Sequence, residues 1–184
     1  MKILLWGIPC VGHEKVGQLL AKKMNYEFID QNDIIKKKYG TIDKFNELYS
    51  IDYYRFKIKE DIASDIINTK NDFVMSMSFI YIEEIVKNII NTDTISIEIT
   101  DNLENIYDRI LFYDENDVVE LDSKEYRDKH KEHYINVIRN DMTTSNLEFK
   151  NIPKFYLNGR NFEDVLDELV EFINDLIKWE IIII

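Results

Sequence analysis

Cysteine, proline and glycine are all scarce in this sequence, which has one, two and five of them in 184 residues. The single thiol, Cys10, excludes an intramolecular disulfide. No apolar run approaches the roughly 20 residues that a membrane-spanning helix needs, and no cationic-then-apolar signal peptide opens the chain. No linker, repeat or low-complexity tract divides it. We therefore predict a cytoplasmic protein with one domain over residues 1–178 and a short apolar tail at 179–184.

Positive charge is scarce too, because 23 Lys and Arg stand against 35 Asp and Glu and the net charge is -12. Nucleic-acid backbones and anionic lipid surfaces attract basic proteins, so we predict no nucleic-acid partner and no membrane partner. Hydrophobic residues, in contrast, make up 45% of the chain and recur along almost its whole length. That proportion is typical of a globular domain and argues against intrinsic disorder.

Short apolar runs alternate with helical patterns throughout the chain. Strands are predicted at residues 2–6, 26–30, 73–78, 94–100 and 154–158. Helices are predicted after residue 12, at 32–39, at 41–49, from Asp52 as N-cap, at 81–90, from Asp101 as N-cap, at 124–141 and at 161–178, with a loop at 114–122. Five repeats of strand then helix predict an α/β fold, in which a five-stranded parallel sheet is flanked by helices in three layers.

A turn with two glycines follows the first predicted strand. Residues 7–14 read GIPCVGHE, and Gly7 and Gly12 have the spacing of a P-loop, G-x-x-x-x-G-K-[ST], between a strand and a helix. Such glycines let backbone N–H groups close around phosphate at a helix N-terminus. His13 stands where the motif has its phosphate-binding lysine, and Glu14 where it has the Mg²⁺-binding hydroxyl. Two spaced glycines also fit a tight turn that binds no ligand.

The residues that follow the turn favour the P-loop interpretation. Residues 16–30, VGQLLAKKMNYEFID, closely resemble the shikimate kinase family, and the similarity continues through residues 34–40 to Tyr54 and Arg55. The similarity in residues is close up to about residue 55. Beyond that residue, it lies in the pattern of strands and helices. The resemblance implies a P-loop kinase fold that phosphorylates a shikimate hydroxyl, with ATP and Mg²⁺ as cofactors. The nucleotide-binding residues that it implies are Gly7, Cys10, Val11, Gly12, His13, Glu14 and Lys15.

The resemblance also assigns one catalytic and two substrate-binding residues. Asp30 matches the first acid of the family's Asp-x-Asp motif, which lies near Mg²⁺ and the substrate hydroxyl, and it ends a predicted strand where α/β sheets build their sites. Asn32 replaces the second acid, and its amide can hydrogen-bond a hydroxyl but cannot act as a base. Arg55 matches the arginine that grips the shikimate carboxylate, while Ile58 replaces the glutamate expected three residues later.

Other family positions lack the residues that the reaction uses. Residues 75–79 contain no glycine, although the family has a glycine-rich segment there. Residues 110–123 contain no basic residue, although the family's lid carries an arginine. Lys131 or His130 is the weak substitute for a later arginine that binds the substrate carboxylate.

At several further positions, we prefer a structural role to a functional one. Arg109 and Arg160 are predicted to be surface residues, and Cys10 a small space-filling residue. His13 is either simply the first residue of a helix or, as its place in the turn favours, a contact for any anion that the turn binds. His130 and His133 do not share an i, i+4 face of a helix, so no metal site is predicted.

Two classes of function remain open. The first is a shikimate kinase with weak or lost activity, because the chain lacks the positive charge that phosphoryl transfer needs around the transferred group. The second is a non-catalytic pseudo-kinase that binds a nucleotide, a small hydroxylated acid or a protein, although the sequence identifies no protein partner. A kinase for another small hydroxylated substrate is a third possibility.

Overall fold

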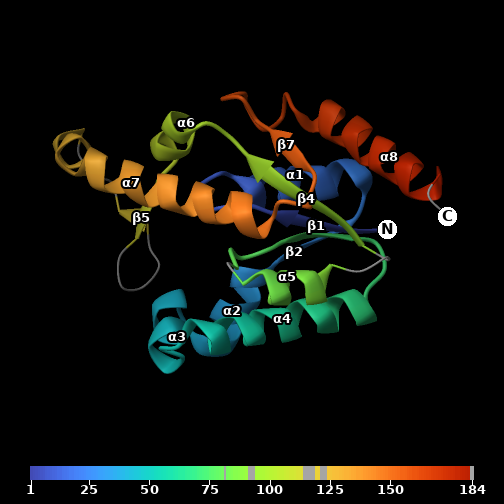
Figure 1. Cartoon of the computed structure of the whole chain (residues 1–184), viewed down its shortest axis with the longest axis horizontal. Coiled ribbons are helices and arrows are strands. Elements are labelled where there is room, and N and C mark those ends of the chain that lie inside the picture. The colour runs from blue at the N-terminus through green and yellow to red at the C-terminus, as the bar shows by residue number, and fades with distance from the viewer. Residues whose placement is uncertain (81, 91–93, 114–118, 121–123, 183–184) are drawn as a thin grey trace.

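The computed structural model describes residues 1–80, 82–90, 94–113, 119–120 and 124–182, and Figure 1 shows how its helices and strands are arranged. In chain order the elements are β1 (Lys2–Trp6), α1 (His13–Met24), β2 (Glu27–Asp30), α2 (Gln31–Tyr39), α3 (Ile42–Leu48), α4 (Asp52–Thr69), β3 (Phe73–Ser76), α5 (Glu83–Ile89), β4 (Thr94–Thr100), α6 (Leu103–Asp108), β5 (Phe112–Tyr113), β6 (Val119–Glu120), α7 (Lys124–Glu148), β7 (Lys154–Tyr156) and α8 (Leu166–Ile182).

Five strands form one parallel sheet in the order β2-β3-β1-β4-β7. Leu4 in the central strand β1 lies opposite Met75 of β3 and Ser96 of β4. Helices α1 and α8 cover one face of the sheet, and α4 and α5 cover the other (Figure 1). The predicted fold, a five-stranded parallel sheet between two layers of helices, is confirmed.

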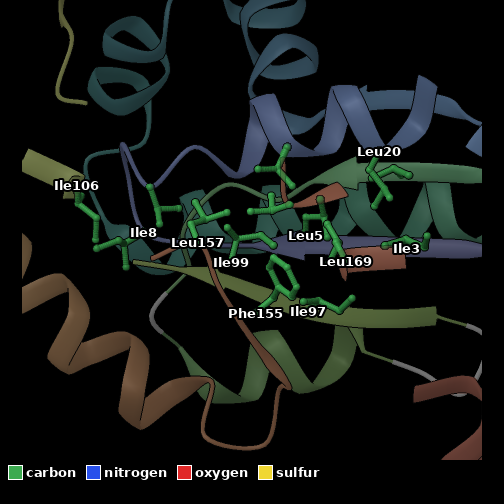
Figure 2. Close-up of a cluster of buried hydrophobic side chains, with 14 of the residues drawn as sticks. Ile3, Leu5, Ile8, Leu20, Ile97, Ile99, Ile106, Phe155, Leu157 and Leu169 are labelled. Carbon is green, nitrogen blue, oxygen red and sulfur yellow. The ribbon is translucent and has the colours of Figure 1, made fainter. Parts of the chain in front are cut away.

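Each face of the sheet has its own hydrophobic core. Ile3 and Leu5 of β1 belong to the core under α1 and α8, which Figure 2 shows in close-up. Leu4 and Trp6 belong to the core under α4 and α5. Successive side chains of a strand point to opposite faces of its sheet, so a strand covered on both faces is apolar without alternation. Full burial of each such side chain stabilises the fold by about 1.5–3 kcal/mol.

Two helix starts differ from the prediction. Helix α6 is capped by Asn102 and not by Asp101, and Asp52 is the first residue of α4 rather than its cap. Each predicted cap carboxylate pairs with an arginine instead: Asp101 with Arg109 and Asp52 with Arg55. A capping pattern in sequence does not reveal such a competing partner.

The chain after β4 departs further from the predicted boundaries. The last helix begins at Leu166 rather than at 161, and α7 continues to Glu148. Strands β5 and β6 form a small antiparallel pair that the sequence does not predict, and β6 lies within the predicted loop at 114–122. The other residues of that loop, and residues 183–184 of the predicted tail, lie outside the described residues. No described helix is long and apolar enough to cross a membrane.

The carboxyl ends of β1, β2 and β3 meet at one edge of the sheet. Asp30 at the end of β2 lies opposite Ser76 at the end of β3. Directly after β3, Met77 N donates a 2.9 Å hydrogen bond to Leu5 O of β1. Ligand sites of open parallel sheets form outside this edge, so the predicted site residues are brought to the expected place.

Candidate functional site

The loop between β1 and α1 is a closed turn. Val11 N donates a 3.3 Å hydrogen bond to Ile8 O, and Cys10 between them has a φ of 65°. Pro9 followed by a residue with positive φ is the pattern of a type II turn. The side chains of Ile8 and Val11 are buried in the core under α1 and α8. The N–H group of Val11, one of those predicted to face a phosphate, is therefore already bonded within the loop.

Both loop glycines are required by close packing. Gly12 has a φ of 99°, and a Cβ there would lie 2.4 Å from the ring of Phe162. A Cβ on Gly7 would lie 2.6 Å from Val11 Cγ1 and 3.0 Å from His13 Nδ1. Protein interiors are too densely packed to absorb such overlaps without rearrangement. Packing alone thus accounts for the two spaced glycines, whether or not the loop binds phosphate.

His13, the first residue of α1, turns its imidazole into the protein. The residue is 2% exposed, and its Nε2 atom lies 3.0 Å from Met77 O. A carbonyl oxygen can only accept, so Nε2 carries a hydrogen and donates it. The Nδ1 atom lies 3.4 Å from Glu14 Oε2, and among the described residues it has no hydrogen-bond partner. The ring that replaces the P-loop lysine is therefore bound to the chain just beyond β3.

Asp30 and Asn32 lie at the start of α2. Asp30 caps α2, because its Oδ1 atom accepts a 2.8 Å hydrogen bond from Asn32 N. Asn32 Oδ1 accepts a 2.8 Å bond from Ser78 Oγ. Gln31 is fully buried between them; its Oε1 atom accepts from Ser78 N at 3.0 Å, and its Nε2 atom donates to Lys59 O at 2.7 Å. The predicted acid and the replacement of the second acid are thus brought together.

Residues 77–79, here named the β3 exit segment, are held one by one. Met77 O accepts from His13, and Ser78 bonds to Gln31 through its N–H and to Asn32 through its hydroxyl. Phe79 O accepts a 3.3 Å bond from Lys59 Nζ. His13 and Asn32 replace two chemically different family residues, and both hydrogen-bond to the β3 exit segment. That segment is also the part that lacks the family's glycines.

Arg55 is folded back toward the end of α3. Its Nη1 atom donates to Tyr49 O at 2.7 Å and lies 3.5 Å from Asn46 O, and its Nη2 atom pairs with Asp52. The last carbonyls of a helix lack intrahelical donors, so a guanidinium in this position caps α3. The group predicted to grip a substrate carboxylate is thus bonded to Tyr49 O and Asp52 within the fold.

The carboxylates at this edge are electrostatically unbalanced. Burial raises the pKa of the Asp30 carboxyl, and the Asn32 N–H lowers it. The charges of Asp33 and Glu14 raise that pKa further, whereas His13 lowers it. The net result is a raised pKa, because a partly buried carboxylate with two acidic neighbours is disfavoured in its charged form.

Lys59 on α4 is a second charged residue at this edge whose pKa is shifted. Burial, and after it the positive charge of Arg55, lower the pKa of the Lys59 ammonium to about 8. Its polar contact is the 3.3 Å bond to Phe79 O, and it lies 5.4 Å from the centroid of the Phe56 ring. No carboxylate of the described residues forms an ion pair with it.

Cys10 lies in the turn, where burial raises the pKa of its thiol. The Leu111 N–H lowers that pKa, and the charges of Glu14 and Asp141 raise it. Since the thiolate is the reactive form, the raised pKa marks an unreactive cysteine. This environment agrees with the predicted space-filling role.

Arg109, predicted to be a surface residue, is instead part of a buried cluster. Its side chain is 22% exposed and pairs through Nη2 with Asp101 at 2.6 Å. Its Nη1 atom lies 3.3 Å from Val11 O, and its guanidinium lies 5.3 Å from the centroid of the Phe162 ring. Asp101 also accepts from Gly159 N. The cluster ties the β1–α1 loop to the chain after β4 and β7, a role that a lone arginine in a helical pattern does not reveal.

The remaining predicted residues lie apart from this edge. Lys15 is exposed and bonds along α1 to Gln18 Oε1 at 3.4 Å. On α7, Lys131 lies 5.4 Å from the centroid of the Tyr107 ring, and His130 packs on a tyrosine ring of its own helix. Within the described ranges, no group of three or more His, Cys, Asp or Glu could hold a metal ion.

Two residues at this edge, Gln31 and Lys59, were not predicted from the sequence. Gln31 stands between the two positions of the family's Asp-x-Asp motif, which was the signal available for it. Lys59 follows Arg55 by four residues and so shares a face of the same helix. That spacing was the signal that could have identified it.

Comparison with known proteins relates both the sequence and the fold to one family. A family model described as shikimate kinase matches residues 9–173. A shikimate kinase from Bacteroides thetaiotaomicron superposes with a TM-score of 0.72 at 12% identity, covering 95% of this chain and 98% of that chain. Shikimate kinase from Acinetobacter baumannii in complex with shikimate superposes with a TM-score of 0.70 at 17% identity, covering 95% and 93%.

A shikimate kinase from Aquifex aeolicus superposes with a TM-score of 0.65 at 20% identity, covering 95% of this chain and 96% of that chain. At such identities the structural likeness concerns the fold. No curated protein matches the sequence.

Proposed function

The chain belongs to the shikimate kinase family, and from this premise we propose that it is a member with weak or lost phosphotransferase activity that serves as a binding module for a small hydroxylated acid. The family activity is ATP-dependent phosphorylation of a shikimate hydroxyl, normally with Mg²⁺. In the proposed role the acid binds at the carboxyl edge of β1, β2 and β3. Nucleotide binds there weakly.

The observation that carries the proposal is the position of the His13 ring. Phosphoryl transfer depends on positive charge placed around the transferred group. The P-loop lysine reaches the phosphates on a long flexible chain, whereas His13 has a short ring bound to Met77 O and 2% exposed. A unit charge about 4 Å from another contributes roughly 4 kcal/mol at an effective dielectric of 20. Loss of that contribution in the transition state slows the reaction by orders of magnitude.

ATP–Mg²⁺ fits the groups that remain poorly. Carboxylates such as Asp30 suit Mg²⁺, which kinases hold with one or two carboxylates together with the substrate phosphates. Glu14 adds a negative charge where the motif has a neutral hydroxyl, and this charge repels a triphosphate. No step of the proposed function therefore involves the nucleotide.

The acid side of the site keeps groups that recognise hydroxyls. The Asn32 amide and the Ser78 hydroxyl, 2.8 Å apart, can exchange their mutual hydrogen bond for bonds to a ligand. Asp30 adds an acceptor beside Asn32. The structure from Acinetobacter baumannii is a complex with shikimate, which supports a hydroxylated acid as the ligand class.

The proposal is tested by coupled ADP release with shikimate, ATP and Mg²⁺ at saturation. We expect turnover far below the usual enzymatic range of about 1–10³ s⁻¹. Calorimetry should give an ATP–Mg²⁺ dissociation constant no tighter than about 1 mM, which is roughly 4 kcal/mol of binding free energy. Turnover in the usual range that disappears in an Asp30→Asn variant would defeat the proposal, and so would micromolar affinity for ATP.

The double change His13→Lys, Glu14→Ser tests whether the loop is a former phosphate site. It restores the lysine and the hydroxyl of the motif and removes one negative charge. We expect ATP to bind at least tenfold more tightly, about 1.4 kcal/mol. If the folded variant binds ATP no better than the parent, the loop is a tight turn that never held phosphate.

A slow kinase is the second candidate, and the environment of Asp30 favours it. Burial first, and then the neighbouring carboxylates, raise the pKa of Asp30, which is the direction that suits a general base. This candidate predicts slow turnover that Asp30→Asn abolishes. Running the assay with other small hydroxylated acids extends the same test to a kinase with a different substrate.

A further inference from the structure

We infer that Lys59, rather than Arg55, supplies the positive charge that binds the carboxylate of the small acid. The inference rests on the proposed function, in which a hydroxylated acid occupies the carboxyl edge of β1, β2 and β3. Lys59 lies outside both the P-loop motif and the Asp-x-Asp motif, so neither motif assigns it a ligand-binding role.

The geometry places Lys59 inside the network of the site. Its carbonyl accepts a 2.7 Å bond from Gln31 Nε2, so the α4 backbone is fixed against the start of α2. Its ammonium donates to Phe79 O at 3.3 Å, at the end of the β3 exit segment. The neighbouring residue Ser78 bonds through its hydroxyl to Asn32. The ammonium and the hydroxyl-binding pair are therefore attached to consecutive residues, whose Cα atoms lie about 3.8 Å apart.

This spacing suits a small molecule with both chemical groups. A carboxylate at the ammonium and ring hydroxyls at Ser78 and Asn32 fit within one compact acid. An ammonium is a compact point charge with three donors. After one bond to Phe79 O, it has two further donors for the oxygens of a carboxylate.

Lys59 is partly buried without a matching anion. None of the ion pairs of the described residues includes it, and its other close neighbour is the ring of Phe56. Buried charges in proteins are ordinarily paired, because desolvation is costly. The cost appears as the lowered pKa of this ammonium. A bound carboxylate would supply the missing partner.

Arg55 has the opposite character. Its guanidinium already has Asp52 as a counter-ion and Tyr49 O as an acceptor. Binding a substrate carboxylate through Arg55 would require breaking a salt bridge and uncapping α3. Binding through Lys59 breaks neither. The matched family position therefore holds a structural arginine, and the ligand charge has moved one helical turn along α4.

The test is calorimetry with shikimate as probe on the full chain, in parallel with its methyl ester, which keeps the hydroxyls but lacks the charge. We expect Lys59→Met to weaken shikimate binding by about 10- to 100-fold, the effect of a hydrogen bond to a charged group. Its affinity for the methyl ester should change little. Lys37→Met, which removes an exposed lysine of α2, is the matched control and should bind like the parent.

A second measurement needs no variant. Amine-reactive labelling of the parent protein, mapped by mass spectrometry, should show Lys59 protected by shikimate and Lys37 unprotected. Full shikimate affinity in a folded Lys59→Met variant, or lack of protection of Lys59 under saturating shikimate, would overturn the inference and leave the proposed function standing. Failure of the parent to bind shikimate at all would overturn both.

Discussion

The two halves of the sheet differ in how fully their buried charges are paired. In the half formed by β4 and β7, Glu98 is 3% exposed and bonds to Ser145 Oγ and Lys154 Nζ. In the same half, Asp101 pairs with Arg109 at 2.6 Å. Each buried carboxylate there has a cation and at least one further donor.

In the half formed by β2 and β3, Glu60 pairs with Lys57, but Lys59 and Asp30 form no ion pair with any residue that the structure describes. Lys59 is partly buried, and Asp30 has acidic neighbours that raise its pKa after burial does. His13 Nδ1 is buried without a hydrogen bond to any described residue. Satisfied polar groups stabilise a fold, whereas unsatisfied ones persist where a ligand or a reaction needs them. The paired carboxylates of the β4–β7 half stabilise the fold, and the unpaired charges of the β2–β3 half support the proposed ligand site there.

Substitution of Arg109 should produce the largest effect in this comparison. Arg109→Met leaves Asp101 buried without its cation, and removal of one partner from a buried pair costs about 3–5 kcal/mol. We expect about 3 kcal/mol here because Arg109 is 22% exposed and Asp101 keeps other donors. Urea unfolding of the parent and the variant at pH 7 measures the difference.

Lys23→Met is the control, since Lys23 pairs with Asp167 at the surface. Exposed pairs contribute about 0–1 kcal/mol, so this variant should unfold close to the parent. Equal effects of the Arg109 and Lys23 variants would contradict the structural role of the β4–β7 half. Burial also raises the pKa of Asp101, but its bonds to Asn105, Arg109 and Asn102 N outweigh burial and lower it overall. That stability is therefore present above the ordinary carboxyl pKa and is lost as the pH falls through the lowered value.

Substitution of Lys59 should have the opposite sign. Lys59→Met removes a charge whose desolvation no ion pair of the described residues offsets, so we expect the variant to be more stable by about 2 kcal/mol at pH 7, after discounting for partial exposure. Lys57→Met, two residues away, removes the cation 2.5 Å from the buried Glu60 and should lower stability. A loss of stability in Lys59→Met would show that Lys59 is a structural residue.

The pH dependence sharpens the test of Lys59. Its pKa is 10.5 in a free chain and about 8 in the fold. Between these values the unfolded chain binds more protons, so the free energy of unfolding of the parent rises with pH. The penalty is complete below pH 8 and disappears above 10.5. The advantage of Lys59→Met should therefore shrink across that window in urea titrations.

The fold could be predicted from the sequence because it depends on patterns that are local. The strands at residues 2–6 and 94–100 coincide with β1 and β4, and their apolar runs are long enough to be distinctive. Boundaries near Asp101 and Asp52 were wrong because each carboxylate pairs with an arginine eight or three residues further along the chain, and Asp101 also accepts from the distant Gly159 N. Tertiary partners of a polar residue are not encoded in its neighbours along the chain.

The sequence predicted where the candidate site residues lie in the fold better than it predicted their contacts. The sequence brings Asp30, Asn32 and His13 to the carboxyl edge of the sheet, where the structure has them. It does not reveal that His13 and Asn32 bind the β3 exit segment, since that depends on contacts across 64 and 46 residues. Lys59 lacks a sequence signal beyond its spacing from Arg55.

Asp30 gives the smallest and most specific test of the comparison. Asn caps a helix about as well as Asp, so Asp30→Asn keeps the bond from Asn32 N while it removes the charge. We expect a gain in stability of about 0.5 kcal/mol at pH 7, within the range of ordinary substitutions. Burial, and then the charges of Asp33 and Glu14, raise the pKa of Asp30 in the fold.

The sign of the pH effect follows from that raised pKa. The folded parent holds its proton to a higher pH than the unfolded chain, so the contribution of Asp30 to stability is full below the unfolded pKa of 3.8 and is lost as the pH rises through the folded value. The advantage of Asp30→Asn should therefore be largest at neutral pH and vanish near pH 3. Asp101→Asn, in the satisfied half, should lose stability at neutral pH. If both variants lose stability at pH 7, the carboxylate of Asp30 has a partner in the fold, and the distinction between the two halves fails there.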